Sequence, residues 1–92
     1  MSAPYLIIYD ISSTKRRNKV AKLIEQVGVR IQYSSFYCFV PKTTLFEILT
    51  KLHQLIDTRT DSIVVVHLPD NWEKYVIGNL KNPIDNSRKM VL

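Results

Sequence analysis

The sequence predicts a single α+β domain with the element order β-α-β-β-α-β. Short runs rich in β-branched and aromatic residues, typical of strands, flank two segments whose apolar residues recur at helical spacing. A length of 92 residues suits one domain, and 46% hydrophobic with 23% charged residues is an ordinary globular composition. Right-handed crossovers then interleave the two strand–helix–strand units into a four-stranded antiparallel sheet with both helices on one face. This arrangement is a ferredoxin-like sandwich.

The first strand and the first helix are predicted from the N-terminal third of the chain. Residues 5–9, Tyr-Leu-Ile-Ile-Tyr, form a brief apolar run that indicates a buried central strand. The hydroxyl residues at 12–14 are candidate caps for a helix over residues 15–27, whose apolar side chains share one helical face. Gly28 stands where a helix end favours a left-handed residue.

Two strands follow this helix. Residues 29–32 and 35–40 predict a pair joined by a tight connection, and the second of them is the more continuously apolar. We therefore expect this second strand to lie beside the 5–9 strand at the centre of the sheet.

The second helix and the last strand of the sheet come after Pro41. Apolar residues at helical spacing between positions 45 and 56 predict the helix, and Thr44 with Glu47 forms a candidate capping box at its start. Residues 63–68 are mostly β-branched or apolar and predict the fourth strand.

One face of this sheet is left without a helix, and a second copy of the chain is the expected cover. Residues 72–78 predict a fifth strand that has no vacancy in its own sheet, so we expect it to be exchanged onto the edge of the partner's sheet. The domain then comprises residues 1–78, and residues 79–92 are predicted as a polar C-terminal tail. A homodimer also suits a domain this small, which buries only a little over half of the surface that its unfolded chain exposes.

The formal net charge of +5 makes a polyanion such as nucleic acid the expected partner. The alternative is that the basic residues merely form a solvated helix face. Five of the 13 basic residues fall within eight positions, and they are the predicted nucleic-acid-binding residues: Lys15, Arg16, Arg17, Lys19 and Lys22.

Several classes of protein are disfavoured. No apolar run approaches the roughly 20 residues of a membrane span, and residues 1–4 lack the layout of a signal peptide. Cys38 is the single cysteine, so no internal disulfide forms. We expect a cytoplasmic protein without a membrane partner.

Asp10 is the candidate metal ligand. It ends a predicted central strand and precedes a basic helix, whose N-terminal N–H groups favour a phosphate. Magnesium or manganese takes one or two carboxylates together with water and substrate phosphate oxygens. No second acidic residue lies near Asp10 in the chain, so the two-fold axis of a dimer would supply a second Asp10. The alternative is that Asp10 only satisfies the turn into the helix.

Other polar and aromatic residues have two interpretations. Arg30, Tyr33 and Phe36 combine the arginine and aromatic residues of nucleic-acid surfaces, although an aromatic residue in a strand, such as Phe36, is more often core. We interpret Asp57 and Asp61 as turn residues of the loop before the last strand.

Several spaced motifs resemble the CRISPR-associated Cas-two family. They are Tyr-Asp-Ile at 9–11, Lys-Arg-Arg-Asn-Lys at 15–19, and Gly-Val-Arg-Ile-Gln-Tyr-Ser-Ser-Phe at 28–36, which follows the family pattern G-x-R-x-Q-x-S-x-F. Residues 55–63 and 72–78 are similar to archaeal members. The resemblance extends over about residues 5 to 78.

The resemblance implies a ferredoxin-like homodimer that acts in CRISPR adaptation, or spacer acquisition. Such a dimer bridges two dimers of the integrase partner, Cas-one, and helps to hold the prespacer duplex. The resemblance also implies a magnesium-dependent endonuclease, hydrolysing phosphodiester bonds of single-stranded RNA or double-stranded DNA. Scaffolding is favoured as the main role. The competing reading is a toxin-type endoribonuclease of the related virulence-associated family.

The resemblance also assigns site residues. The family's metal aspartate falls on Asp10, with Arg16 as a neighbouring phosphate contact. In one place the chain departs from the family, because Tyr37 and Cys38 follow the motif where members commonly have an acidic and then a small residue. The supporting catalytic positions fall on Tyr9, Arg17, Arg30, Ser34 and Phe36.

Overall fold

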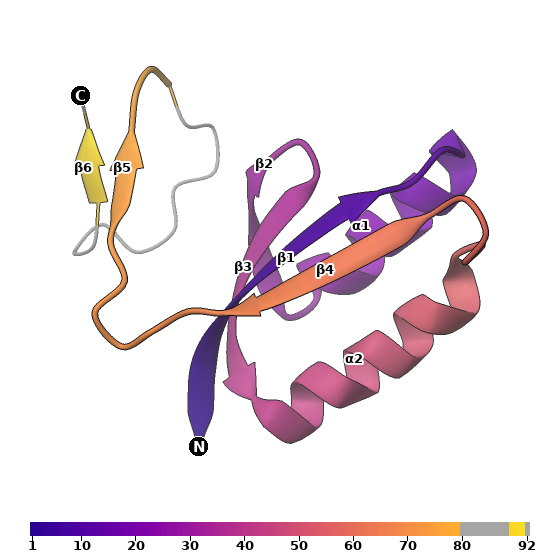
Figure 1. Ribbon diagram of the computed structural model, residues 1–92, viewed down its shortest axis with the longest axis horizontal. Coiled ribbons are helices and arrows are strands. Elements are labelled where there is room, and N and C mark those ends of the chain that lie inside the picture. The colour runs from indigo at the N-terminus through magenta and orange to yellow at the C-terminus, as the bar shows by residue number, and fades with distance from the viewer. Residues whose placement is uncertain (80–88, 92) are drawn as a thin grey trace.

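The computed structural model describes residues 1–79 and 89–91 (Figure 1). The main domain has the predicted order of elements, which are β1 (Ser2–Asp10), α1 (Thr14–Glu25), β2 (Gly28–Gln32), β3 (Ser35–Pro41), α2 (Lys42–Leu55) and β4 (Ser62–His67). The four strands form one antiparallel sheet in the order β2-β3-β1-β4. The predicted ferredoxin-like fold is therefore confirmed, and β1 and β3 occupy the centre of the sheet as expected.

The core lies between the sheet and the two helices, and in Figure 1 α1 passes behind β1 and β4. Alternate residues of β1 point into this core, because successive side chains of a strand point to opposite faces. Burial of the odd-numbered side chains of β1 removes apolar surface from water and is the main contribution to stability. The buried cluster includes Tyr5, Ile7 and Tyr9 of β1, Phe36, Cys38 and Val40 of β3, Val20, Ala21 and Ile24 of α1, and Leu45, Ile48 and Leu52 of α2.

The ends of both helices follow from local chemistry. Ser13 caps α1, since its hydroxyl accepts a hydrogen bond of 3.2 Å from the backbone N–H of Arg16. The capping box predicted at Thr44 is wrong, because α2 begins earlier, at Lys42. Pro41 takes the cap position in an extended conformation without a side-chain cap, and its fixed φ suits a chain about to enter a helix.

Gly28 serves a different purpose from the one predicted. It is the first residue of β2 rather than a left-handed residue after α1, and Gly78 alone among the described residues has a positive φ. A Cβ atom at Gly28 would lie 2.5 Å from Sγ of Cys38 and 2.7 Å from the carbonyl oxygen of Tyr37. The glycine therefore permits the close approach of β2 to β3.

The C-terminal segment forms a second, small sheet. The predicted fifth strand appears as β5 (Lys74–Val76), outside the four-stranded sheet, and it pairs in parallel with β6 (Lys89–Val91) of the same chain. The predicted polar tail thus contributes a strand, while residues 80–88 and 92 lie outside the described residues. Over the described part of the chain, neither helix has the length and apolar character needed to cross a membrane.

Candidate nucleic-acid and metal site

Asp10 is the last residue of β1 and lies opposite Ser62, the first residue of β4. Tyr9 beside it is buried in the core, so strand alternation places the exposed Asp10 side chain on the opposite, uncovered face of the sheet. Ser62 is also exposed and, as its direct cross-strand partner, shares this face. The sequence does not predict that Ser62 lies beside Asp10, because the order of residues along the chain does not show which residues pair across two strands.

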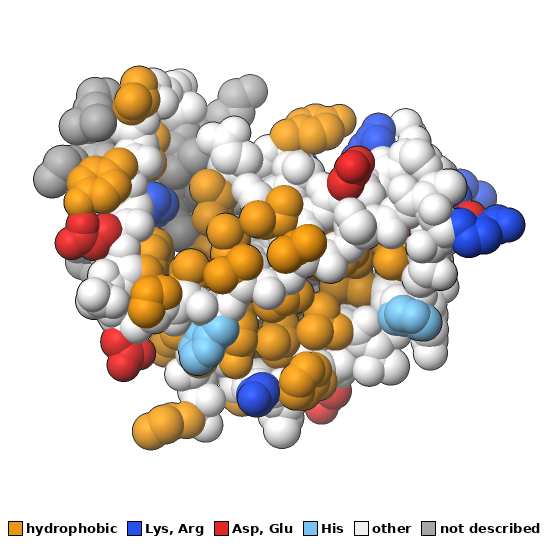
Figure 2. Space-filling model, in the orientation of Figure 1, with side chains coloured by type: hydrophobic (Ala, Val, Ile, Leu, Met, Phe, Trp, Pro, Cys, Tyr) orange, Lys and Arg blue, Asp and Glu red, His pale blue; other side chains and the backbone are white. Residues whose placement is uncertain are grey.

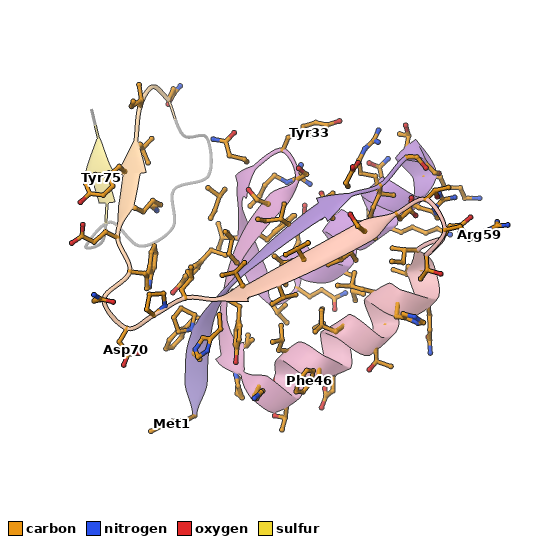
Figure 3. The ribbon with its side chains drawn as sticks, in the orientation of Figure 1. Met1, Tyr33, Phe46, Arg59, Asp70 and Tyr75 are labelled. Atoms are coloured by element: carbon orange, nitrogen blue, oxygen red, sulfur yellow. The ribbon has the colours of Figure 1, made fainter. Side chains whose placement is uncertain are left out.

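The turn between β2 and β3 is fastened beside the end of β1. The backbone N–H of Tyr9 donates to the carbonyl of Ser34 at 3.0 Å. The carbonyl of Tyr33 accepts from the Tyr9 hydroxyl at 3.4 Å and from Nη1 of Arg30 at 3.2 Å. Burial raises the pKa of the Tyr9 phenol, which therefore stays protonated and able to donate. Figure 3 shows Tyr33 at the tip of this turn with its ring directed outward.

Phe36 supports this turn from within the core. Its side chain is fully buried, its ring lies 6.2 Å from that of Tyr9, and the Arg30 guanidinium lies 5.1 Å from its centroid. Arg30 also approaches Glu25 of α1 at 3.5 Å. The structure therefore gathers Tyr9, Arg30 and Phe36 on the helix-covered side of the sheet, whereas Asp10 lies on the other side.

Arg17 connects α1 to the residue that follows Asp10. Its Nη1 donates to the carbonyl of Ile11 at 2.9 Å, and its Nη2 donates to the hydroxyl of Thr14 at 3.0 Å. Both groups belong to the passage from β1 into α1, so Arg17 holds the backbone on the C-terminal side of Asp10.

The basic residues of α1 divide into two groups. Lys15, Lys19 and Lys22 are exposed at spacings of four and three residues, so they form one stripe along the helix. Within the described residues none of these lysines has an ion-pair partner. Arg16 differs, because its Nε and Nη2 donate to the carboxylate of Asp61 at 2.8 and 3.3 Å. Within α1, whose Arg17 is also engaged in hydrogen bonds, the cations available to a phosphate backbone are thus the lysines.

The sequence predicts a turn residue at Asp61, and in the structure its buried side chain also joins α1 to the loop before β4. Its side chain is 0% exposed, and it is the only buried charged residue among those described. Besides Arg16, its carboxylate accepts from the backbone N–H and hydroxyl of Ser12 and from the backbone N–H of Asp57. The hydrogen bond from Arg16 is the main cause that holds the pKa of this carboxyl well below its ordinary value.

Asp57 does form the expected turn. Its side chain accepts from the backbone N–H of Arg59 at 3.0 Å, and its carbonyl accepts from the N–H groups of Thr60 and Asp61. The side chain of Arg59 pairs with the same carboxylate at 3.0 Å, and the resulting hydrogen bonds lower the pKa of Asp57. In Figure 3 Arg59 lies at the outer end of the α2–β4 loop.

The uncovered face of the sheet is apolar. Figure 2 looks onto this face and shows hydrophobic side chains over the centre of the sheet, with charged ones mainly toward the margins. Val64 is 53% exposed and Phe39 is 60% exposed, which is unusual for large apolar residues gathered in one area. We name this surface the open face and define it by its exposed apolar residues: Ile8, Val29, Phe39, Val64 and Val66.

The described residues of one chain hold no cluster of metal-ligating side chains. Among the described residues no three His, Cys, Asp or Glu side chains gather as a metal-binding group. Asp10 offers a single exposed carboxylate at the rim of the open face. Since magnesium and manganese take one or two protein carboxylates with water and phosphate oxygens, two Asp10 side chains brought together would fit such an ion.

The chain matches the family model described as CRISPR associated protein Cas2 over residues 3–76. It is 38% identical over 78 residues to a CRISPR-associated endoribonuclease Cas2 of Thermodesulfovibrio yellowstonii, covering 85% of this chain and 86% of the relative. It is also 38% identical over 76 residues to a CRISPR-associated endonuclease Cas2 of Halalkalibacterium halodurans, covering 77% and 79% of the two chains.

Solved structures agree with these relatives. A Streptococcus pyogenes Cas2 crystal structure aligns with a TM-score of 0.71 at 38% identity and covers 75% of this chain and 89% of that one. A hypothetical protein of Thermus thermophilus aligns with a TM-score of 0.80 at 27% identity, over 91% and 98% of the two chains. The matched region spans both the β1–α1 junction with Asp10 and the β2–β3 turn. The chain is thus a member of the Cas2 family of CRISPR-associated proteins.

Proposed function

We propose that two copies of this chain form a cytoplasmic homodimer that serves CRISPR adaptation and carries a metal-dependent endonuclease site at paired Asp10 residues. The observation that carries the proposal is the position of Asp10, an exposed carboxylate at the rim of the open face. In adaptation the dimer bridges the integrase Cas-one and holds the prespacer duplex. The family match favours this role over a toxin-type endoribonuclease.

The open face supports the choice of a second copy as its cover. Burying exposed apolar side chains against an identical surface is favourable, at about 25 cal/mol for each Å² removed from water. A two-fold contact uses the same patch on both copies, so an axis that passes beside the Asp10 end of β1 would bring the two Asp10 carboxylates together. Because Asp10 lies on the rim of the open face, the contact that covers the apolar surface would then also supply the second carboxylate.

Each remaining residue has a defined task in this proposal. The two Asp10 carboxylates would hold a magnesium or manganese ion, which when bound supplies an activated water and neutralises charge on the scissile phosphate. Arg17 holds the carbonyl of Ile11 and thereby the backbone next to Asp10. Tyr9, Arg30 and Phe36 hold the turn that carries Tyr33 and Ser34.

The lysine stripe of α1 is suited to a phosphate backbone rather than to particular bases. Lysine side chains bind phosphates as mobile point charges, and contacts to phosphate do not read sequence. One side of α1 carries Lys15, Lys19 and Lys22, and together these lysines would follow one strand of a duplex. This arrangement suits a prespacer, whose sequence varies.

The name of the Thermodesulfovibrio relative specifies RNA as the nucleic acid that is cut, whereas that of the Halalkalibacterium relative does not. Asp10→Asn is the direct test, with single-stranded RNA and double-stranded DNA offered in parallel with Mg²⁺. We expect cleavage to fall at least about 100-fold, while the mass of the dimer and its affinity for duplex stay unchanged. Cleavage that survives in Asp10→Asn protein at the wild-type rate would refute the nuclease assignment.

A further inference from the structure

The carboxylate of Asp61 closes a small circuit of contacts around Asp10. After the end of β1 at Asp10, the chain continues through Ile11 to Ser12, whose N–H and hydroxyl donate to Oδ1 of Asp61 at 3.2 and 3.3 Å. On the neighbouring strand, Ser62 lies opposite Asp10 and is the residue directly after Asp61. Asp61 therefore binds the backbone two residues after Asp10 and directly precedes the residue that pairs with Asp10 across the sheet.

From this geometry we infer that Asp61 is a positioning residue for the Asp10 carboxylate, a role that rests on the proposed function of Asp10. Asp61 does not act on substrate directly. Its side chain is 0% exposed, and both of its oxygens already accept hydrogen bonds from Arg16, one of them also from Ser12 and the other from Asp57. It acts through the backbone of Ser12, two residues beyond Asp10.

Arg16 supplies the positive charge that stabilises the buried Asp61 carboxylate. We call the contacts among Asp61, Arg16 and Ser12 the anchor. A buried carboxylate without a partner is costly, whereas a carboxylate that receives several N–H donors is well satisfied. Arg16 also donates from Nη2 to the hydroxyl of Ser12 at 3.3 Å, so the arginine, the serine and the aspartate contact one another. Arg16 is thus assigned to the anchor rather than to the nucleic-acid surface.

Loss of the anchor should affect the metal before it affects the nucleic acid. Removing a group that orients a metal ligand typically lowers metal affinity or activity 10- to 100-fold. In Asp61→Asn protein we expect Mn²⁺ affinity to fall by about tenfold or more, and the Mg²⁺ concentration at half-maximal cleavage to rise by a similar factor. The KM for nucleic acid should stay within about twofold, because the lysine stripe is untouched.

The matched control is Asp57→Asn in the same loop. That variant loses the ion pair with Arg59, but the backbone N–H of Asp57 still donates to Asp61 and Ser12 is unaffected. It should keep wild-type Mn²⁺ affinity. Arg16→Lys serves as a milder second variant, which retains a cation beside Asp61 and should give an intermediate loss.

If the substitution only reduced the fraction of folded protein, the amount of Mn²⁺ bound at saturation would fall, but the Mn²⁺ concentration at half-saturation would not change. Titration therefore distinguishes partial unfolding from weaker metal binding. Hydrogen exchange at the Ser12 amide gives a second readout that does not depend on activity, and it should quicken in Asp61→Asn. Dimeric Asp61→Asn protein with wild-type Mn²⁺ affinity would overturn the positioning role alone. Wild-type protein that binds no Mn²⁺ through Asp10 would instead overturn the proposed function beneath it.

Discussion

Two aspartates at the same end of the sheet have opposite surroundings. Asp10 is exposed and faces the open side of the sheet, whereas Asp61 is buried and surrounded by donors. A carboxylate that is to hold a metal ion beside a phosphate needs access to solvent and to both ligands. One that must hold backbone needs its oxygens filled by N–H and O–H groups. Exposure therefore suits Asp10 to the proposed metal, and burial suits Asp61 to holding the backbone.

The first prediction concerns acid stability. Because the pKa of Asp61 lies below its ordinary value of 3.8 in the folded chain, the unfolded chain binds its proton first as the pH falls. The contribution of Asp61 is complete above that ordinary value and is lost as the pH falls toward the folded pKa. Asp61→Asn protein should accordingly be less stable at neutral pH, and its free energy of unfolding should fall less in acid.

Urea unfolding of the two proteins at a series of pH values from about 6 to 2 checks this expectation. The difference in free energy of unfolding between wild type and Asp61→Asn should shrink as the solution is acidified. A difference that is constant across the series would show that the charge of Asp61 contributes nothing to stability.

At the scale of residues, the sequence predicts site residues that belong to a local motif. It does not predict contacts between residues far apart in the chain, because these form only on folding. Asp10 and Arg17 belong to the neighbouring motifs at residues 9–11 and 15–19, and the structure places both at the junction of β1 with α1. Asp61 lies 45 residues from its partner Arg16. No periodicity or local spacing reports such a pairing, so the sequence predicts a turn at Asp61 but not its ion pair with Arg16.

At the scale of elements, α1 joins the two halves of the site. Its N-terminal end is held by Ser13, Arg16 and Arg17, and its exposed side carries the lysine stripe. One helix thus connects the backbone around Asp10 to the surface proposed for nucleic acid.

The second prediction separates these two sides of α1. Replacing Lys15, Lys19 and Lys22 with glutamine should reduce the slope of log affinity for duplex against log salt by about 2 to 3. Arg16→Gln should change that slope by less than about 1, because Asp61 already takes up its charge. Fluorescence anisotropy over a range of salt concentrations measures both slopes, and equal effects of Arg16 and the lysines would contradict the division.

The order of elements and the central strands were predictable because hydrophobic periodicity specifies them. The boundaries were less so. β1 begins at Ser2, three residues before the predicted start. α2 begins at Lys42, because Pro41 can lead directly into a helix without a side-chain cap. The close approach of β2 to β3 at Gly28 was likewise invisible, since it depends on Cys38 and Tyr37 across the sheet.

At the scale of the whole molecule, the open face is the surface that one chain leaves unfinished. The sequence indicated that one sheet face lacks helices, and the structure shows this face to be apolar (Figure 2). Asp10, exposed at the end of β1, lies at its rim. The predicted exchange of residues 72–78 onto a partner remains a prediction, because within one chain β5 pairs with β6. An arrangement of two chains cannot be read from the pattern of one.

The third prediction tests the open face as the dimer contact. Val64→Lys places a charge on this face and should weaken the dimer by at least about tenfold, because a charge would be buried in an apolar contact. Phe46→Lys is the matched control, since Phe46 is 55% exposed on α2 and Val64 is 53% exposed on β4. Sedimentation equilibrium measures both, and equal weakening would place the contact elsewhere.

The central claim is that a second chain completes the site of the first, and the stoichiometry of Mn²⁺ binding tests it most directly. Native mass spectrometry of the metal-loaded protein should show one ion for each pair of chains, with none in Asp10→Asn protein. One ion for each single chain, or the same ion retained by Asp10→Asn, would contradict the account.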